Sequence, residues 1–133
     1  MIGHLSLGVA DLSRSTAFYD AALAPLGAVR VWSADDGAGY GFAGRPDVLA
    51  LKLQTGRVSP PGPGFHLAFA APSREAVAAF HAAALAQGGD NAGAPGLRPH
   101  YGDGYYAAFV IDPDGHKLEA VNQRPPEERR AAP

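Results

Sequence analysis

Several residue classes and patterns are missing from this chain of 133 residues, and each absence excludes a class of function. There is no cysteine, which excludes a disulfide framework, a thiolate metal site and a cysteine nucleophile. No run of about 18 apolar residues occurs, so we expect no membrane-spanning helix. The net charge is −2 and no basic stripe is present, which argues against a nucleic-acid partner. The first residues also lack the charged and apolar regions of a signal peptide, and we expect a cytoplasmic protein.

The chain does contain an internal repeat with an offset of 62 residues. At this offset His4 aligns with His66, and Ala17-Phe18 aligns with Ala79-Phe80. The match continues to Gly27 without a gap. An internal repeat of this length predicts two structural modules that share one core.

Each half is interpreted as one strand, one helix and then further strands. Alternating apolar residues and turn signals predict strands at about 2–9, 28–33, 39–44, 48–54, 105–111 and 116–122, with another around Phe65–Phe69. The first helix is expected to be capped by Asp11 or Ser13 and to end near Leu23, and the second to begin after Ser73. Residues 90–104, rich in glycine and proline, are interpreted as a long loop.

These elements predict one domain over residues 1–123. Its modules span about 1–55 and 64–123, separated by a Pro/Gly-rich connector. The segment 124–133 is charged and proline-rich, and we expect it to be a disordered tail.

Three side chains suggest a metal site. The period of the strands places His4 and His66 on the faces opposite the apolar residues, and Glu119 likewise alternates with apolar neighbours. In a pseudo-symmetric pairing of the modules, the two imidazoles would approach each other across a cleft. Two histidines and one carboxylate suit Zn, Ni, Mn or Fe as divalent ions. The alternative is that each histidine is an ordinary structural or surface residue.

Two segments of the chain resemble a known family. Residues 2–12 (IGHLSLGVADL) and residues 112–119 (DPDGHKLE) are similar to the opening strand and the last hairpin of the vicinal oxygen chelate superfamily. That superfamily includes glyoxalase I, extradiol dioxygenases, fosfomycin-resistance proteins and bleomycin-binding proteins. The resemblance covers about residues 1–122. It implies an α+β fold of two tandem βαβββ modules in a pseudo-two-fold arrangement, with a curved mixed sheet around a cleft. It also implies a divalent metal, often a homodimer, and metal-ligand positions at His4, His66 and Glu119.

A fourth ligand of the glyoxalase I type is missing from the first module. Aligning the turns of the two modules places Lys52 opposite Glu119, and a shift of two residues places Ala50 there. Alanine has no donor atom, and lysine must lose its proton before it can bind a metal. The three remaining ligands are similar to the set in extradiol dioxygenases and fosfomycin-modifying enzymes. We predict that Lys52 holds an anionic substrate group; the alternative is a solvated lysine on an edge strand.

The 90–106 segment carries further candidates. Arg98 is a candidate for binding a carboxylate or phosphate of the substrate. Tyr101, as a catalytic residue beside Glu119, and Tyr105, as a substrate-binding residue, are candidates for orienting a metal-bound oxygen. The alternative is that the tyrosines pack the cleft wall and that Arg98 is a surface charge.

Four other residues have simpler interpretations. We expect His81 to lie on a helix surface and His116, which follows a turn glycine, to be solvent-exposed. Trp32 and Tyr40 are interpreted as cleft-lining or interface residues.

The hypothesis drawn from these patterns is a metal-dependent enzyme that acts on a small oxygen-chelating molecule. Its reaction would be of the glyoxalase-like lyase or isomerase type, or of the extradiol dioxygenase type. The alternative is a metal-free protein that binds a small molecule, such as a bleomycin-type antibiotic. A third possibility is a scaffold that keeps the ligands without activity. The presence of His4, His66 and Glu119 together favours the enzyme, because a metal-free pocket does not need all three.

Overall fold

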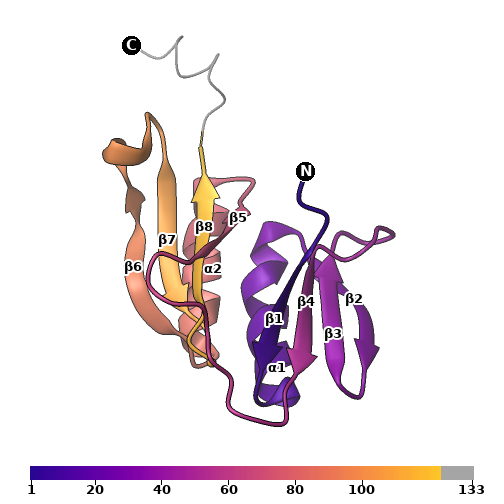
Figure 1. Ribbon diagram of the computed structural model, residues 1–133. Helices are drawn as coiled ribbons and strands as arrows, with labels where there is room; N and C mark the ends of the chain where they lie inside the picture. The colour runs from indigo at the N-terminus through magenta and orange to yellow at the C-terminus, as the bar shows by residue number, and fades with distance from the viewer. Residues whose placement is uncertain (124–133) are drawn as a thin grey trace.

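The computed structural model describes residues 1–123 and contains two modules of the same design (Figure 1). The first comprises β1 (Leu5–Val9), α1 (Leu12–Leu23), the 3₁₀ helix η1 (Ala24–Leu26), β2 (Val29–Ala34), β3 (Gly37–Gly41) and β4 (Leu49–Leu53). The second comprises β5 (Leu67–Ala70), α2 (Arg74–Ala86), β6 (Asp90–Leu97), the 3₁₀ helix η2 (Pro99–Tyr101), β7 (Tyr106–Ile111) and β8 (Lys117–Asn122). The predicted α+β fold of two βαβββ modules is confirmed. The tail predicted at 124–133 lies outside the described residues.

Each module forms its own four-stranded sheet. The strand orders are β1-β4-β3-β2 and β5-β8-β7-β6, with the first strand of each module parallel to the last. The two sheets are not joined by strand pairing, so β1 and β5 each lie at a sheet edge. Instead, α1 packs against α2, and one hydrophobic core runs through both modules. The sequence prediction placed the two sheets around one cleft, whereas within a single chain the modules meet through their helices (Figure 1).

The helices begin where the sequence predicts. The Asp11 side chain accepts a hydrogen bond from the backbone N–H of Arg14, and the Ser73 hydroxyl accepts one from Ala76, both at 3.0 Å. Such caps satisfy donors that the first helical turn leaves unpaired. No helix within residues 1–123 is both long and apolar enough to cross a membrane.

The segment predicted as a loop at 90–104 contains an edge strand. β6 spans Asp90–Leu97 and pairs with β7, but its register shifts after Asn91 and again after Gly93. An edge strand tolerates Gly93, Pro95 and Gly96 because only one of its sides must form a regular hydrogen-bond ladder. These residue types hid the strand from pattern analysis.

The turn between β7 and β8 connects the two modules through buried polar groups. Asp112 Oδ2 accepts a hydrogen bond from the Tyr19 hydroxyl at 2.5 Å and lies 2.8 Å from His116 Nδ1. Asp114 accepts hydrogen bonds from the backbone of Ala10 and the hydroxyl of Ser15, at the start of α1. His116 is 3 % exposed, so its predicted exposure is wrong. Asp112, His116 and the Asp114 side chain are buried where the turn docks on the first helix of the other module.

Tyr40 and Trp32 occupy opposite faces of the first sheet. Tyr40 is a fully buried core residue that donates a hydrogen bond to Asp20 on α1, and it also lines an apolar pocket between the modules. Trp32 lies on the other face, where its indole covers Gly39: a Cβ there would meet Trp32 Nε1 at 1.9 Å. The indole N–H donates to Asp47 Oδ2 at 3.1 Å.

We predict that the buried Asp112 cluster makes the fold sensitive to acid. Burial acts to raise the pKa of Asp112, but hydrogen bonds from His116 and Tyr19 outweigh it and hold that pKa below its usual value. A carboxyl group with a lowered folded pKa stabilises the fold above its unfolded pKa of about 4, and this contribution is lost as the pH falls through the folded pKa. Urea unfolding from pH 7 down to pH 3 should therefore show a steeper loss of stability for the wild type than for Asp112→Asn. At pH 7 the variant should be less stable by about 1–3 kcal/mol, and equal stability at that pH would contradict the role of the cluster.

The contact between Trp32 and Gly39 gives a second prediction. Gly39→Ala should displace the indole, lower the free energy of unfolding by about 1–3 kcal/mol and shift the fluorescence of this single tryptophan. Gly56→Ala is the matched control, because its Cβ would meet no atom within 4 Å. An unchanged emission spectrum in Gly39→Ala would contradict the packing.

Candidate metal and substrate site

Glu119 is a buried carboxylate at the centre of the second sheet. It lies on β8 between β5 and β7, where it pairs with Ala68 and Phe109, and it is 1 % exposed. Its neighbours Leu118 and Ala120 belong to the core beneath α2, so Glu119 occupies the opposite, outer face of the sheet. A buried charge requires partners, and this one has two.

Both carboxylate oxygens of Glu119 have a partner from the sequence-predicted set. Glu119 Oε1 lies 2.9 Å from His66 Nε2, and Glu119 Oε2 accepts a hydrogen bond from the Tyr105 hydroxyl at 2.5 Å. Burial and the neighbouring Glu119 raise the pKa of Tyr105 above its usual value. Tyr105 therefore stays protonated at neutral pH and acts as a donor.

The pair His66 and Glu119 fits two ligands of a divalent metal ion. An imidazole nitrogen and a carboxylate oxygen are both donors for such ions, and here they already lie in contact. Burying a carboxylate costs free energy, so Glu119 at this position contributes little to stability by itself.

His4 does not join this pair within one chain. It is exposed and lies just before β1, at the edge of the other sheet. No group of three His, Cys, Asp or Glu residues in the described part of the chain is arranged to hold a metal. The predicted approach of His4 to His66 across a cleft is therefore not formed inside a single chain.

Strand register decides between the two possible counterparts of Glu119. On β8, Glu119 pairs with Ala68, whose repeat equivalent in the first module is Ser6. Ser6 pairs with Ala50 on β4, so Ala50 is the counterpart and the first module offers no fourth ligand. Lys52 lies two residues after Ala50 on the same face of β4, and its ammonium is 5.6 Å from the centre of the Trp32 ring.

The other predicted residues gather beside His66. Arg98 and Tyr101 line a pocket of about 260 Å³ together with His66. The Tyr101 ring lies 5.3 Å from the Tyr105 ring, and its side chain is largely exposed. The second module thus brings Arg98, Tyr101, Tyr105, His66 and Glu119 to one face of its sheet.

Two further residues of this pocket were missed by sequence analysis. Phe109 and Lys117 both line it. Lys117 precedes Glu119 by two residues on the same strand, so the period of the strand was a signal that it shares this face.

The sequence model of the Glyoxalase/Bleomycin resistance protein/Dioxygenase superfamily matches residues 1–120. The chain belongs to this superfamily. Its solved members include a glyoxalase/bleomycin resistance protein from Albidiferax ferrireducens T118, which is 36% identical. That alignment covers 92% of this chain and 97% of the other, with a TM-score of 0.72. No curated protein matches the chain at a significant level.

More distant structures support the superfamily fold. A glyoxalase-related enzyme from Fulvimarina pelagi is 26% identical over 89% of this chain and 85% of the other, with a TM-score of 0.68. The fosfomycin resistance protein FosX from Listeria monocytogenes is 22% identical over 97% of both chains, with a TM-score of 0.67. At that identity the likeness concerns the fold alone.

Glu119 allows a test of whether its burial serves structure or function. We expect Glu119→Leu to keep the free energy of unfolding of the metal-free protein within about 1 kcal/mol of the wild type, or to raise it, because a buried polar carboxyl group is replaced by an apolar side chain. The partners left behind, His66 and Tyr105, have access to water. Urea unfolding in the presence of a chelator measures the effect. A loss of about 3 kcal/mol or more would instead show that Glu119 is required for the fold.

Proposed function

We propose that this superfamily member is a metal-dependent enzyme that acts on a small oxygen-chelating substrate. The observation that carries the proposal is the buried Glu119 carboxylate in contact with His66 Nε2. These two residues would hold a divalent ion, and His4 would be the third protein ligand. When bound, such an ion polarises neighbouring substrate oxygens or activates O2, which fits lyase, isomerase or dioxygenase chemistry.

The third ligand would come from a second copy of the chain. His4 precedes β1 and His66 precedes β5, and both strands have one side without a strand partner in the described chain. An open strand edge is a template for pairing with another chain. In a two-fold dimer, β1 of one copy beside β5 of the other would bring His4 toward His66 and Glu119, and would do so twice.

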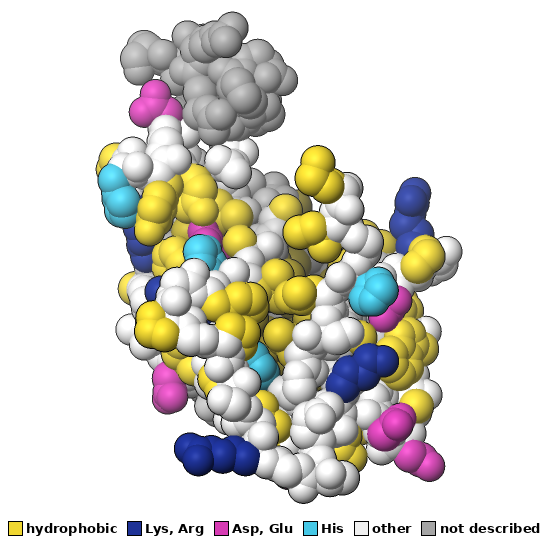
Figure 2. Space-filling view, in the orientation of Figure 1, with side chains coloured by type: hydrophobic (Ala, Val, Ile, Leu, Met, Phe, Trp, Pro, Cys, Tyr) yellow, Lys and Arg dark blue, Asp and Glu magenta, His cyan; other side chains and the backbone are white. Residues whose placement is uncertain are grey.

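Apolar surface beside these edges supports a homodimer. An apolar pocket of about 220 Å³ lies between the modules and is lined by Leu26, Val48 and Ala68, among others. Phe42 and Val48 at its rim are 55% and 50% exposed. Figure 2 shows hydrophobic side chains along the hollow between the modules. Such surface is typical of an interaction site.

The remaining residues have roles around the proposed metal. The Tyr105 hydroxyl donates its hydrogen bond to Glu119 and so orients this carboxylate, while its oxygen would accept a hydrogen bond from a substrate hydroxyl. Tyr101 lies beside it, where it can assist proton transfer. Arg98 lines the adjoining pocket and Lys52 lies on the outer face of the first sheet, and both would bind the substrate.

Metal binding tests the proposal. Wild-type protein should bind Zn, Ni, Mn or Fe, and His4→Ala, His66→Ala or Glu119→Gln should each weaken binding by more than about 100-fold, the upper effect of losing an outer-shell partner. His81→Ala is the matched control, because His81 bonds Asn91 on the opposite side of the module and should have no effect. A wild type that binds no divalent ion at micromolar concentration would contradict the enzyme and favour a metal-free binding protein.

Mixing two variants that each lack one metal ligand tests whether the metal site lies between two chains. When His4→Ala and His66→Ala chains are refolded together, about half of the dimers contain one chain of each kind under random pairing. Each such dimer has one site with both histidines intact, so about a quarter of the wild-type metal binding should return. If nothing returns while the variants do form mixed dimers, the site does not use His4 and His66 from different chains.

A further inference from the structure

Two cations beside the proposed metal site have no counter-charge. Arg98 and Lys117 both line the pocket of about 260 Å³ next to His66. Neither forms an ion pair anywhere in the described residues 1–123. No carboxylate lines this pocket or the neighbouring one, which also contains Lys117 and His66. The pocket surface is therefore cationic.

Both cations lie near the aromatic ring of Phe109. The Arg98 Cζ lies 5.6 Å and the Lys117 Nζ 5.3 Å from the centre of the Phe109 ring. Each contact with the ring is favourable, and both positive charges line the same pocket. Phe109 is itself nearly buried and touches the His66 ring edge-on, with 6.0 Å between ring centres. A negative group in this pocket would lie next to the proposed metal ligand.

The Arg98 guanidinium is held in place before any ligand arrives. Its Nη2 donates to the carbonyl of Ala94 at 2.7 Å, and its Nη1 lies 3.4 Å from the carbonyl of Leu97. Gly93 and Gly96 leave room for it, since a Cβ at either position would lie 3.2 Å from a guanidinium nitrogen. The remaining N–H groups stay available, and a guanidinium fixed in this way loses little freedom on binding an anion.

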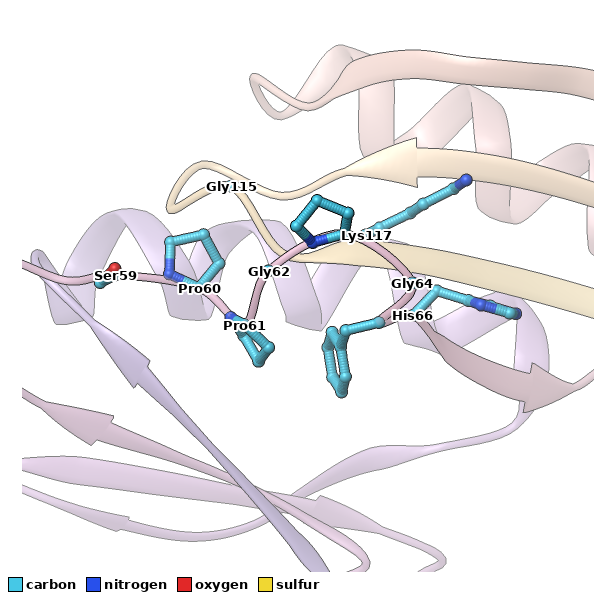
Figure 3. Close-up of a pocket in the computed structure, with 10 residues that line it drawn as sticks. Ser59, Pro60, Pro61, Gly62, Gly64, His66, Gly115 and Lys117 are labelled. Atoms are coloured by element: carbon cyan, nitrogen blue, oxygen red, sulfur yellow. The ribbon is translucent and has the colours of Figure 1, made fainter.

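Lys117 reaches the pocket from the opposite side. It lies on β8 and projects alongside His66 past the connector at Ser59–Gly64 (Figure 3). That connector covers a second hollow of about 610 Å³, which shares Lys117 and His66 with the first. Lys117 is exposed, so its ammonium can turn toward a ligand in either hollow.

We propose that Arg98 and Lys117 form an anion-binding subsite, and that the substrate therefore carries a negatively charged group. A phosphate, a phosphonate or a carboxylate has the oxygen acceptors that a guanidinium and an ammonium bind. The assignment to a substrate rests on the proposed function, because the anion site adjoins His66 and Glu119. The anion site itself exists without metal.

Inorganic phosphate is the probe, titrated into metal-free wild-type protein by calorimetry and by NMR. Phosphate should bind and shift the signals of Phe109 and His66. Lys117→Gln and Arg98→Gln should each weaken binding roughly 10-fold or more, the effect of losing one charge-assisted hydrogen bond. Arg45→Gln is the charge-matched control in the other module and should change binding less than twofold. Lys117→Arg should restore most of the affinity.

Three results would overturn the inference. They are no phosphate binding at tens of millimolar, equal weakening in Arg45→Gln and Lys117→Gln, and shifts confined to residues outside the pocket. If Arg98→Gln disturbs β6, as thermal unfolding would show, Lys117→Gln and Lys117→Arg decide the matter alone.

Two further measurements separate the anion class and the two proposals. Methylphosphonate and acetate are titrated in the same way as phosphate. Tighter binding of methylphosphonate than of acetate indicates that the substrate carries a phosphoryl or phosphonyl group. Binding of acetate as tight as that of methylphosphonate indicates a carboxylate. Lys117→Gln should bind divalent metal within twofold of wild type. If the wild type binds metal but not phosphate, the anion subsite is overturned and the proposal of a metal-dependent enzyme stands. If the wild type binds phosphate but not metal, the anion subsite stands and the metal-dependent enzyme is contradicted.

Discussion

The structure depends on how the two modules are joined. They meet through the packing of α1 on α2 and through the β7–β8 turn, whose Asp112 and Asp114 bond to groups on and beside α1. Because the helices and this turn make the contact, neither sheet pairs with the other, and β1 and β5 are left at open edges. Each module then carries part of the predicted ligand set: His4 before β1 in the first, and His66 and Glu119 in the second.

Pattern analysis recovers what is repeated and local. The 62-residue offset predicts both modules, and alternation puts Glu119 on the face away from the core. The cap at Ser73 is as predicted, and of the two candidates for the first helix the structure uses Asp11. The resemblance of residues 2–12 and 112–119 to the superfamily is confirmed by the match over 1–120. These features are determined within each module, so they do not depend on how the two modules pack together.

What pattern analysis cannot supply is the contact between modules. The same apolar faces are buried whether the sheets meet edge to edge or the helices meet side by side. The pattern of apolar and polar residues therefore does not choose between the two arrangements. The burial of His116 likewise involves a distant helix, because its partner Asp112 also binds Tyr19 on α1. The choice of Ala50 over Lys52 as the counterpart of Glu119 required the pairing of β4 with β1. The strand β6 was predicted as a loop because it contains glycines and a proline, which a strand at the edge of a sheet tolerates.

The open edges of β1 and β5 have a kinetic consequence under the proposed arrangement. If each metal site needs two chains, the number of complete sites follows mass action between protomers. Far below the dimer dissociation constant, site concentration then scales with the square of chain concentration. Specific activity would fall on dilution, and cellular abundance itself would set the catalytic output per polypeptide.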